Sequence, residues 1–104
     1  MNTRERFLTS IKQTVQALDP QAEIILYGSR ARGDARDDSD WDVLILVPYA
    51  VDLQEEQRFR HKLFDLELQY GQAISTHVTS IQEWNDRRSA SPMYQHMFRE
   101  GLRI

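Results

Sequence analysis

A run of five apolar residues, Val43–Val47, follows directly on two aspartates, Asp40 and Asp42. A run this apolar predicts a strand that is covered on both faces. Side chains at positions i and i+2 of a strand project to the same side, so the two carboxylates should point to one place while Trp41 turns the opposite way. Two converging carboxylates repel each other strongly unless a cation lies between them. The start of this strand therefore predicts a cation site.

A Gly-Ser pair upstream supplies what a bound nucleotide needs beside that cation. Gly28 and Ser29 follow the apolar segment 24–27, and ten residues separate Ser29 from Asp40. Glycine lets the backbone approach a phosphate closely, and a helix that opens at Ser29 would direct free N–H groups at the anion. Mg²⁺ commonly takes one or two protein carboxylates and leaves its other positions to water and substrate phosphates. Together the two segments predict a phosphate and Mg²⁺ site.

The order Gly-Ser, ten residues, Asp-x-Asp resembles the signature of the DNA polymerase β-like nucleotidyltransferases. The chain length resembles the minimal nucleotidyltransferase (MNT) branch, of which Arg30–Asp34 and Ser39–Asp42 are also typical. The motif occupies residues 24–47, under half of the chain. The resemblance implies a Pol β-like fold, a nucleoside triphosphate substrate, and transfer of a nucleoside monophosphate, AMP from ATP, to a hydroxyl on a protein or RNA acceptor.

The resemblance also assigns roles to individual residues. Asp40 and Asp42 would be the catalytic and metal-binding pair, whereas Gly28, Ser29 and Arg32 would bind the nucleotide. Many MNT domains are antitoxins of HEPN-domain toxins, so a separate HEPN-domain protein is the expected partner in a toxin–antitoxin system.

A third carboxylate, usual in active enzymes of this class, is not evident. Its expected strand, residues 73–79, contains no acid, and Ser75 or His77 occupies the corresponding face. Asp65 or Glu67 of the preceding helix could substitute. Third acids commonly activate the attacking hydroxyl and hold a second metal. Two functions therefore stay open: a nucleotidyltransferase, or an MNT-like binding module with weak or no activity that regulates a partner.

The remaining pattern predicts an α/β chain with a small mixed sheet of three to four strands flanked by helices, as one domain over 1–104. Apolar spacing and capping residues place the helices and strands. Helices are expected over 3–18, 29–33, 52–70 and 80–88 and from Ser91-Pro92 to Gly101, strands over 23–27, 41–47 and 73–79, and a docked tail at Leu102 and Ile104.

Composition excludes several classes of protein. The net charge of −3 argues against a general nucleic-acid binder, because such proteins concentrate Lys and Arg. The absence of cysteine excludes disulfides and thiolate metal sites. No apolar run reaches the length of a membrane span, and no signal pattern opens the chain, so we expect a cytoplasmic protein.

Residues outside the motif have two readings. The three histidines lack metal-ligand spacing and are expected to be structural, with His77 the more ambiguous. On the last helix, Tyr94, Met97 and Phe98 either complete the core or form a docking surface for a separate protein.

Overall fold

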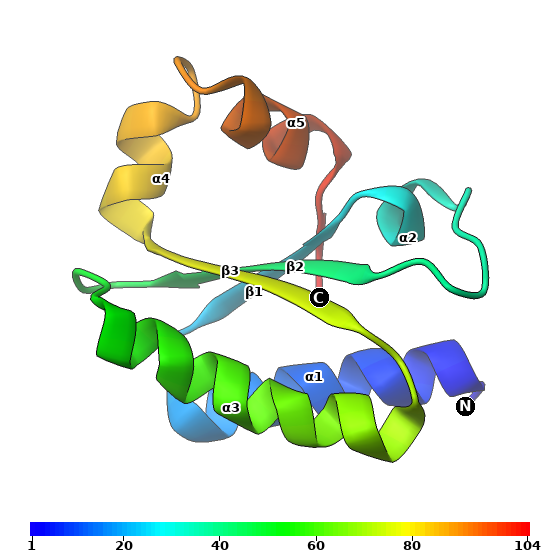
Figure 1. The fold of residues 1–104 in the computed structure, drawn as a ribbon. Coiled ribbons are helices and arrows are strands. Elements are labelled where there is room, and N and C mark those ends of the chain that lie inside the picture. Colours follow the sequence, from blue (N-terminus) through cyan, green and yellow to red (C-terminus); the bar gives the residue numbers. More distant parts are fainter.

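A four-stranded mixed sheet lies between two layers of helices in the computed structural model, which describes residues 1–104 (Figure 1). The strand order is β3-β2-β1-β4. The central strand β1 pairs antiparallel with both β2 and β4, whereas β2 and β3 are parallel. The strands are β1 (Glu23–Tyr27), β2 (Trp41–Val47), β3 (Ile74–Ser80) and β4 (Leu102–Arg103). The predicted small mixed sheet is confirmed.

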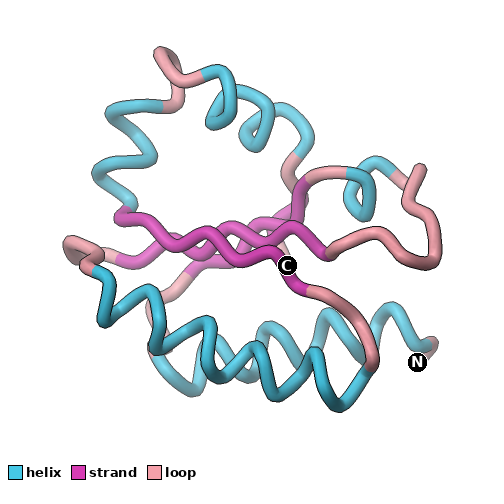
Figure 2. The backbone as a smooth tube through the Cα atoms, in the orientation of Figure 1, coloured by secondary structure: helices cyan, strands magenta, loops and turns pink.

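Five helices complete the fold (Figure 2). Below the sheet in Figure 1 lie α1 and α3, above it lie α4 and α5, and the single turn α2 lies near the end of β1. None of these helices combines the length and the apolar character needed to cross a membrane. The helices are α1 (Thr3–Leu18), α2 (Ser29–Arg32), α3 (Leu53–Tyr70), α4 (Ile81–Arg87) and α5 (Pro92–Glu100).

Strand β2 is buried on both faces, as its apolar run predicts. Side chains of Trp41, Val43 and Ile45 pack into the core formed with α1 and α3. Leu44 and Leu46 pack into the second core, formed with Trp84 of α4 and with α5. By the alternation of strand side chains, Asp42 belongs to the α4–α5 face and Trp41 to the opposite one.

The C-terminal tail is an additional strand. The sequence predicts only a docked tail at Leu102 and Ile104, but Leu102 pairs with Leu26 and Arg103 with Ile25. The amide of Ile104 also donates to the Ile24 carbonyl at 3.0 Å. The outer edge of β1 would otherwise leave N–H and C=O groups unpaired, and a two-residue strand that satisfies them leaves no periodic pattern in the sequence.

Side chains and a glycine cap the ends of the helices. The Asp52 carboxylate accepts from the Glu55 amide at 2.8 Å, so α3 begins one residue later than predicted. Gly71 ends α3 with a left-handed φ of 65°, and the Ser91 hydroxyl accepts from the Tyr94 amide at 3.4 Å. These caps define where α3 ends before β3 and where α5 begins.

Two leucines on α3 test the assignment of its buried face. Leu63 is 1% exposed and Leu68 is 69% exposed. We expect Leu63→Ala to lower the free energy of unfolding by about 2–5 kcal/mol, because it leaves a cavity, and Leu68→Ala to change it by less than about 0.5 kcal/mol. Urea unfolding followed by circular dichroism measures both. Similar losses for the two variants would contradict this packing.

Candidate active site

The two predicted halves of the site meet where β1 ends. Tyr27, the last residue of β1, pairs with Asp42 in the antiparallel register. The next residue, Gly28, has φ 73° and ψ −157°, a conformation almost restricted to glycine. A Cβ on Gly28 would lie 2.3 Å from the Asp42 Oδ2 and 3.2 Å from its Cγ. The carboxyl group of Asp42 therefore packs directly against the backbone of the Gly-Ser turn.

The two aspartates interact electrostatically at this turn. Asp42 is partly buried at the start of β2, and Asp40 precedes it in an exposed position. Burial raises the pKa of Asp42, the negative charge of Asp40 raises it further, and the positive charge of Arg32 lowers it. Burial and the charge of Asp42 together raise the pKa of Tyr27 to about 12. The site therefore concentrates negative charge that a bound cation would relieve.

The Gly-Ser turn presents the start of a helical turn beside Asp42. The amides of Ala31 and Arg32 both donate to the Gly28 carbonyl at 3.0 Å, which makes Ser29 the first residue of α2. Gly33 ends the turn, and its amide donates to the Ser29 carbonyl at 3.0 Å. Amides that open a helical turn have no partner within it, so those of Ser29 and Arg30 are the ones available to an anion.

Arg32 lies near the aspartates but already has partners. Its guanidinium donates to Asp34 at 3.2 Å and to Glu100 of α5 at 3.0 Å. These are exposed ion pairs, which are weak and easily exchanged. The sequence gives no sign of Glu100, because no spacing relates the last helix to the turn. Arg32 is thus held close to Asp42 by an interaction that a phosphate could replace.

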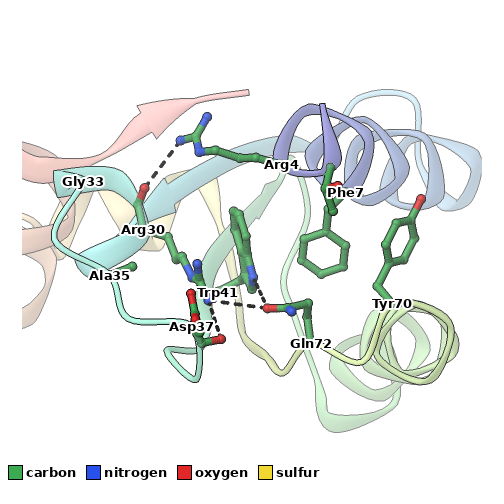
Figure 3. Close-up of a pocket in the computed structure, with 10 residues that line it drawn as sticks. Arg4, Phe7, Arg30, Gly33, Ala35, Asp37, Trp41, Tyr70 and Gln72 are labelled. Atoms are coloured by element: carbon green, nitrogen blue, oxygen red, sulfur yellow. Dashed lines mark hydrogen bonds between the residues drawn. The ribbon is translucent and has the colours of Figure 1, made fainter. Parts of the chain in front are cut away.

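Arg30 acts on the other face of β2, as a clamp on the loop that carries Asp40. Its guanidinium lies 4.5 Å from the ring centroid of Trp41. It donates to the Ser39 carbonyl at 2.9 Å and to the Gln72 side chain at 3.4 Å. Gln72 also accepts from the Trp41 indole at 3.1 Å (Figure 3). These contacts commit Arg30 to the loop rather than to a phosphate or to solvent. Gln72 carries no sequence signal.

A cavity of about 440 Å³ borders this clamp on the α1–α3 face, away from Asp42 (Figure 3). Its aromatic walls are engaged with one another: the ring of Phe7 lies 5.0 Å from both Trp41 and Tyr70, edge to face. Phe7 is 1% exposed and Trp41 4%. Neither the Gly-Ser turn nor the aspartate pair lines the cavity, so the cavity is separate from the candidate site.

The position opposite Asp42 on β3 is Ser75, in the parallel register. β3 has no acid anywhere along its length. The proposed substitutes from α3 are wrong: the Glu67 carboxylate accepts from the Ile74 amide at 2.9 Å, and Asp65 is exposed on a helix that covers the opposite face of the sheet. Helix α3 crosses behind β3 and cannot present these acids to Asp42.

The donor set at the site suits a hard divalent cation. No group of three or more His, Asp or Glu side chains is arranged to hold an ion, so the aspartates are the two protein carboxylates on offer. Two adjacent carboxylates beside a turn with available amides fit Mg²⁺, which completes its octahedron with water and substrate phosphates.

His77 has a structural environment. Its ring lies 3.3 Å, Nε2 to hydroxyl, from Tyr94, and burial lowers its pKa. On the last helix Tyr94 and Met97 are buried and complete the core, whereas Phe98 is 59% exposed. Of the three residues expected on α5, only Phe98 is free to contact a partner.

Sequence comparison identifies the family. The model of the nucleotidyltransferase domain family matches residues 8–91, which include the Gly-Ser turn and both aspartates. The chain belongs to this family and is a transferase domain, which confirms the resemblance seen in the motif. No curated protein sequence matches the chain.

Solved structures share the fold. One is a toxin–antitoxin complex with AMP-PNP, at TM-score 0.66 and 21% identity over 91% of this chain and 69% of that one. A second is a minimal nucleotidyltransferase, at TM-score 0.64 and 21% identity over 96% of this chain and 94% of that one. A third is the toxin–antitoxin MntA–HpeT with two aspartate-to-glutamate substitutions, at TM-score 0.63 and 18% identity over 91% of this chain and 69% of that one. The fold is that of the Pol β-like nucleotidyltransferases.

Two glycines separate backbone strain from steric contact at the turn. Gly28 and Gly33 both have positive φ, but only at Gly28 would a Cβ collide with Asp42. We expect Gly33→Ala to cost about 1 kcal/mol of unfolding free energy and Gly28→Ala about 3 kcal/mol or more. Urea unfolding measures both losses. The carboxyl NMR resonance of Asp42 should shift in Gly28→Ala and stay unchanged in Gly33→Ala. An unmoved Asp42 signal in Gly28→Ala would refute the close approach.

The raised pKa of Asp42 has a consequence for stability. Between the ordinary value of 3.8 and the raised one, the folded chain retains a proton that the unfolded chain has lost. Stability contributed by this group is therefore lost as pH rises through that window. We expect Asp42→Asn to be more stable than wild type at neutral pH, with the difference vanishing below pH 3.8.

Thermal unfolding across pH, without added divalent cation, measures this difference, and Asp38→Asn in the exposed loop is the matched control. Destabilisation by Asp42→Asn at neutral pH would show that the carboxylate is satisfied within the chain.

Proposed function

We propose that this chain binds a nucleoside triphosphate, ATP, with Mg²⁺ and transfers its nucleoside monophosphate to a hydroxyl on a protein or RNA acceptor. The packing of the Asp42 carboxylate against Gly28 supports the proposal, because it brings a turn with available amides next to a carboxylate whose pKa is raised by burial and by the charge of Asp40. The family of the chain supports the reaction class, and a structural neighbour holding AMP-PNP supports an adenine nucleotide.

Each element of the site has a role in this reaction. Asp40 and Asp42 would hold Mg²⁺, which when bound supplies positive charge to the phosphate oxygens. The amides that follow Gly28 bind the β- and γ-phosphates, and the weakly paired Arg32 exchanges Asp34 and Glu100 for a phosphate oxygen.

The bonds exchanged define the products. The acceptor oxygen forms a bond to the α-phosphorus while the bond to the oxygen bridging the α- and β-phosphorus breaks. Pyrophosphate leaves, and the hydroxyl proton passes to water, since β3 provides Ser75 and no carboxylate next to Asp42.

A separate protein supplies the acceptor in this proposal. Phe98 is the only one of the three expected docking residues left exposed. Two neighbours are toxin–antitoxin assemblies. These neighbours support the proposal that the chain is the MNT antitoxin of such a pair, with a HEPN-domain toxin as its partner.

One observation favours a second function. With Ser75 opposite Asp42 and Glu67 bound to the Ile74 amide, no third acid reaches the site. An MNT-like module that binds nucleotide and regulates its partner by contact, with weak or no transfer, needs only the features that are present.

Calorimetric titration with ATP tests the binding step. We expect binding in the presence of Mg²⁺, weakened at least about tenfold without the metal or in Asp40→Asn/Asp42→Asn, because phosphate charge would then be unneutralised. Asp37→Asn/Asp38→Asn removes the same charge from the adjacent loop and should bind normally. Equal affinity in all three proteins would rule out the aspartate pair as the metal site.

Labelled ATP separates the two functions. The chain is co-expressed with the product of the adjacent gene and incubated with ATP labelled at the α-phosphate. Label on the partner that requires Asp40 and Asp42 supports the transferase. Partner inhibition that survives loss of both aspartates, with no transfer, supports the binding module.

A further inference from the structure

An exposed aromatic side chain surrounded by arginines lies on the outer surface of α4, α5 and β4. Phe98 is 59% exposed, and the Arg88 guanidinium lies 4.8 Å from its ring centroid. Trp84 backs the ring at 6.5 Å between centroids. We call the surface formed by Arg88, Phe98, Arg99 and Arg103 the Arg–Phe patch.

The patch is contoured on both sides of Phe98. A hollow of about 180 Å³ lies between Phe98, Arg103 and the end of α5 at Gly101. A second, of about 280 Å³, is lined by Phe98, Arg88, Arg99 and Gln95. Phe98 and Arg88 form walls of both hollows. The surface can therefore receive a side chain on either side of an aromatic ridge, which a flat solvated helix face cannot.

Positive charge on the patch is largely uncompensated. Arg88 and Arg99 form no ion pair within the chain, and Arg103 pairs only with Glu23, at 3.6 Å. Three arginines thus gather around one exposed ring in a chain whose net charge is −3. Unpaired guanidinium groups beside an exposed ring favour carboxylates accompanied by apolar or aromatic side chains.

We propose that the Arg–Phe patch docks an acidic segment of the partner protein that carries an apolar or aromatic side chain. The partner itself rests on the proposed function. Nucleic acid fits this surface less well, because affinity for it grows with the number of phosphates neutralised. The patch offers two unpaired arginines, while both lysines, Lys12 and Lys62, lie on α1 and α3 across the sheet.

Docking at the patch would place the partner beside the site. Glu100, in the last turn of α5, holds Arg32, whose charge acts on Asp42. Phe98 and Arg99 lie in that same helical turn. A segment bound there therefore contacts the helix whose Glu100 pairs with Arg32 beside the Gly-Ser turn.

Fluorescence anisotropy with defined peptides tests the patch. The probe is a labelled peptide of glutamate, leucine and tyrosine, and a glutamate–glycine peptide of equal length and charge is its comparison. We expect the wild-type protein to bind the first peptide more tightly than the second. The first peptide should bind about tenfold more weakly to Arg88→Glu/Arg99→Glu than to wild type, and about three- to tenfold more weakly to Phe98→Ala.

Matched controls lie on the opposite layer of helices. Arg6→Glu reverses an exposed, unpaired arginine on α1, and Phe64→Ala removes a phenylalanine that is 53% exposed on α3. Both should bind the peptide as wild type does. Equal losses in the controls, equal binding of the two peptides, or no binding would overturn the proposal. Tighter binding of an oligouridylate of equal charge, lost in the same variants, would replace it with a nucleic-acid surface.

Calorimetry on the same proteins distinguishes this inference from the proposed function. Mg²⁺-dependent ATP binding should be unchanged in Phe98→Ala and Arg88→Glu/Arg99→Glu, which also shows that they fold. Normal ATP binding without peptide binding would refute the patch alone, whereas wild-type protein that fails to bind ATP would refute the proposed function.

Discussion

The contact between the Asp42 carboxylate and the backbone of Gly28 is the constraint on which the rest of the site depends. A Cβ at position 28 would lie 2.3 Å from the Asp42 Oδ2, so glycine is required for its size as well as for its φ of 73°. This absence of a side chain lets a carboxylate approach the opening of α2. Burial and the charge of Asp40 both act against ionisation of Asp42, and the chain maintains this unfavourable arrangement at a position where a cation would reverse it.

The opposite face of β2 stabilises that arrangement. Trp41 separates the two aspartates in sequence and points into the core beneath them, where it contacts Phe7 and Arg30. Arg30 and Gln72 tie the indole to the loop that ends at Ser39. A loop of seven polar and small residues, 34–40, would otherwise be free to move Asp40 away from Asp42. Strand alternation therefore places Asp42 on one face of β2 and the anchoring side chain of Trp41 on the other.

Most of the fold follows from local sequence signals. The bounds of β1 and β2 match the prediction, because an apolar run bounded by glycine, aspartate and proline has one interpretation. The adjacency of Asp42 and Gly28 could also be predicted, because the turn after β1 and the start of β2 belong to a single motif. The two-residue strand β4 could not be predicted, because its only determinant is the unpaired edge of β1.

Contacts between distant segments were equally hidden from the sequence. The role of Arg30 could not be predicted, because tertiary structure brings its partners Ser39 and Gln72 to it. The sequence allows Glu67 as a third acid because it does not show the direction of α3. In the structure the Glu67 carboxylate accepts from the Ile74 amide at the start of β3 instead. The pairing of Glu100 with Arg32 depends on how α5 returns across the sheet, which no local pattern encodes.

Paramagnetic NMR can locate a metal–nucleotide complex bound between the aspartate pair and the Gly-Ser turn. Mn²⁺ substitutes for Mg²⁺ and broadens amide signals around it. With ATP present, we expect selective loss of the signals of Gly28, Ser29 and residues 40–42, and no such loss in Asp40→Asn/Asp42→Asn. Broadening centred elsewhere, such as on Tyr70 and Gln72 at the cavity behind Trp41, would contradict this placement of the metal.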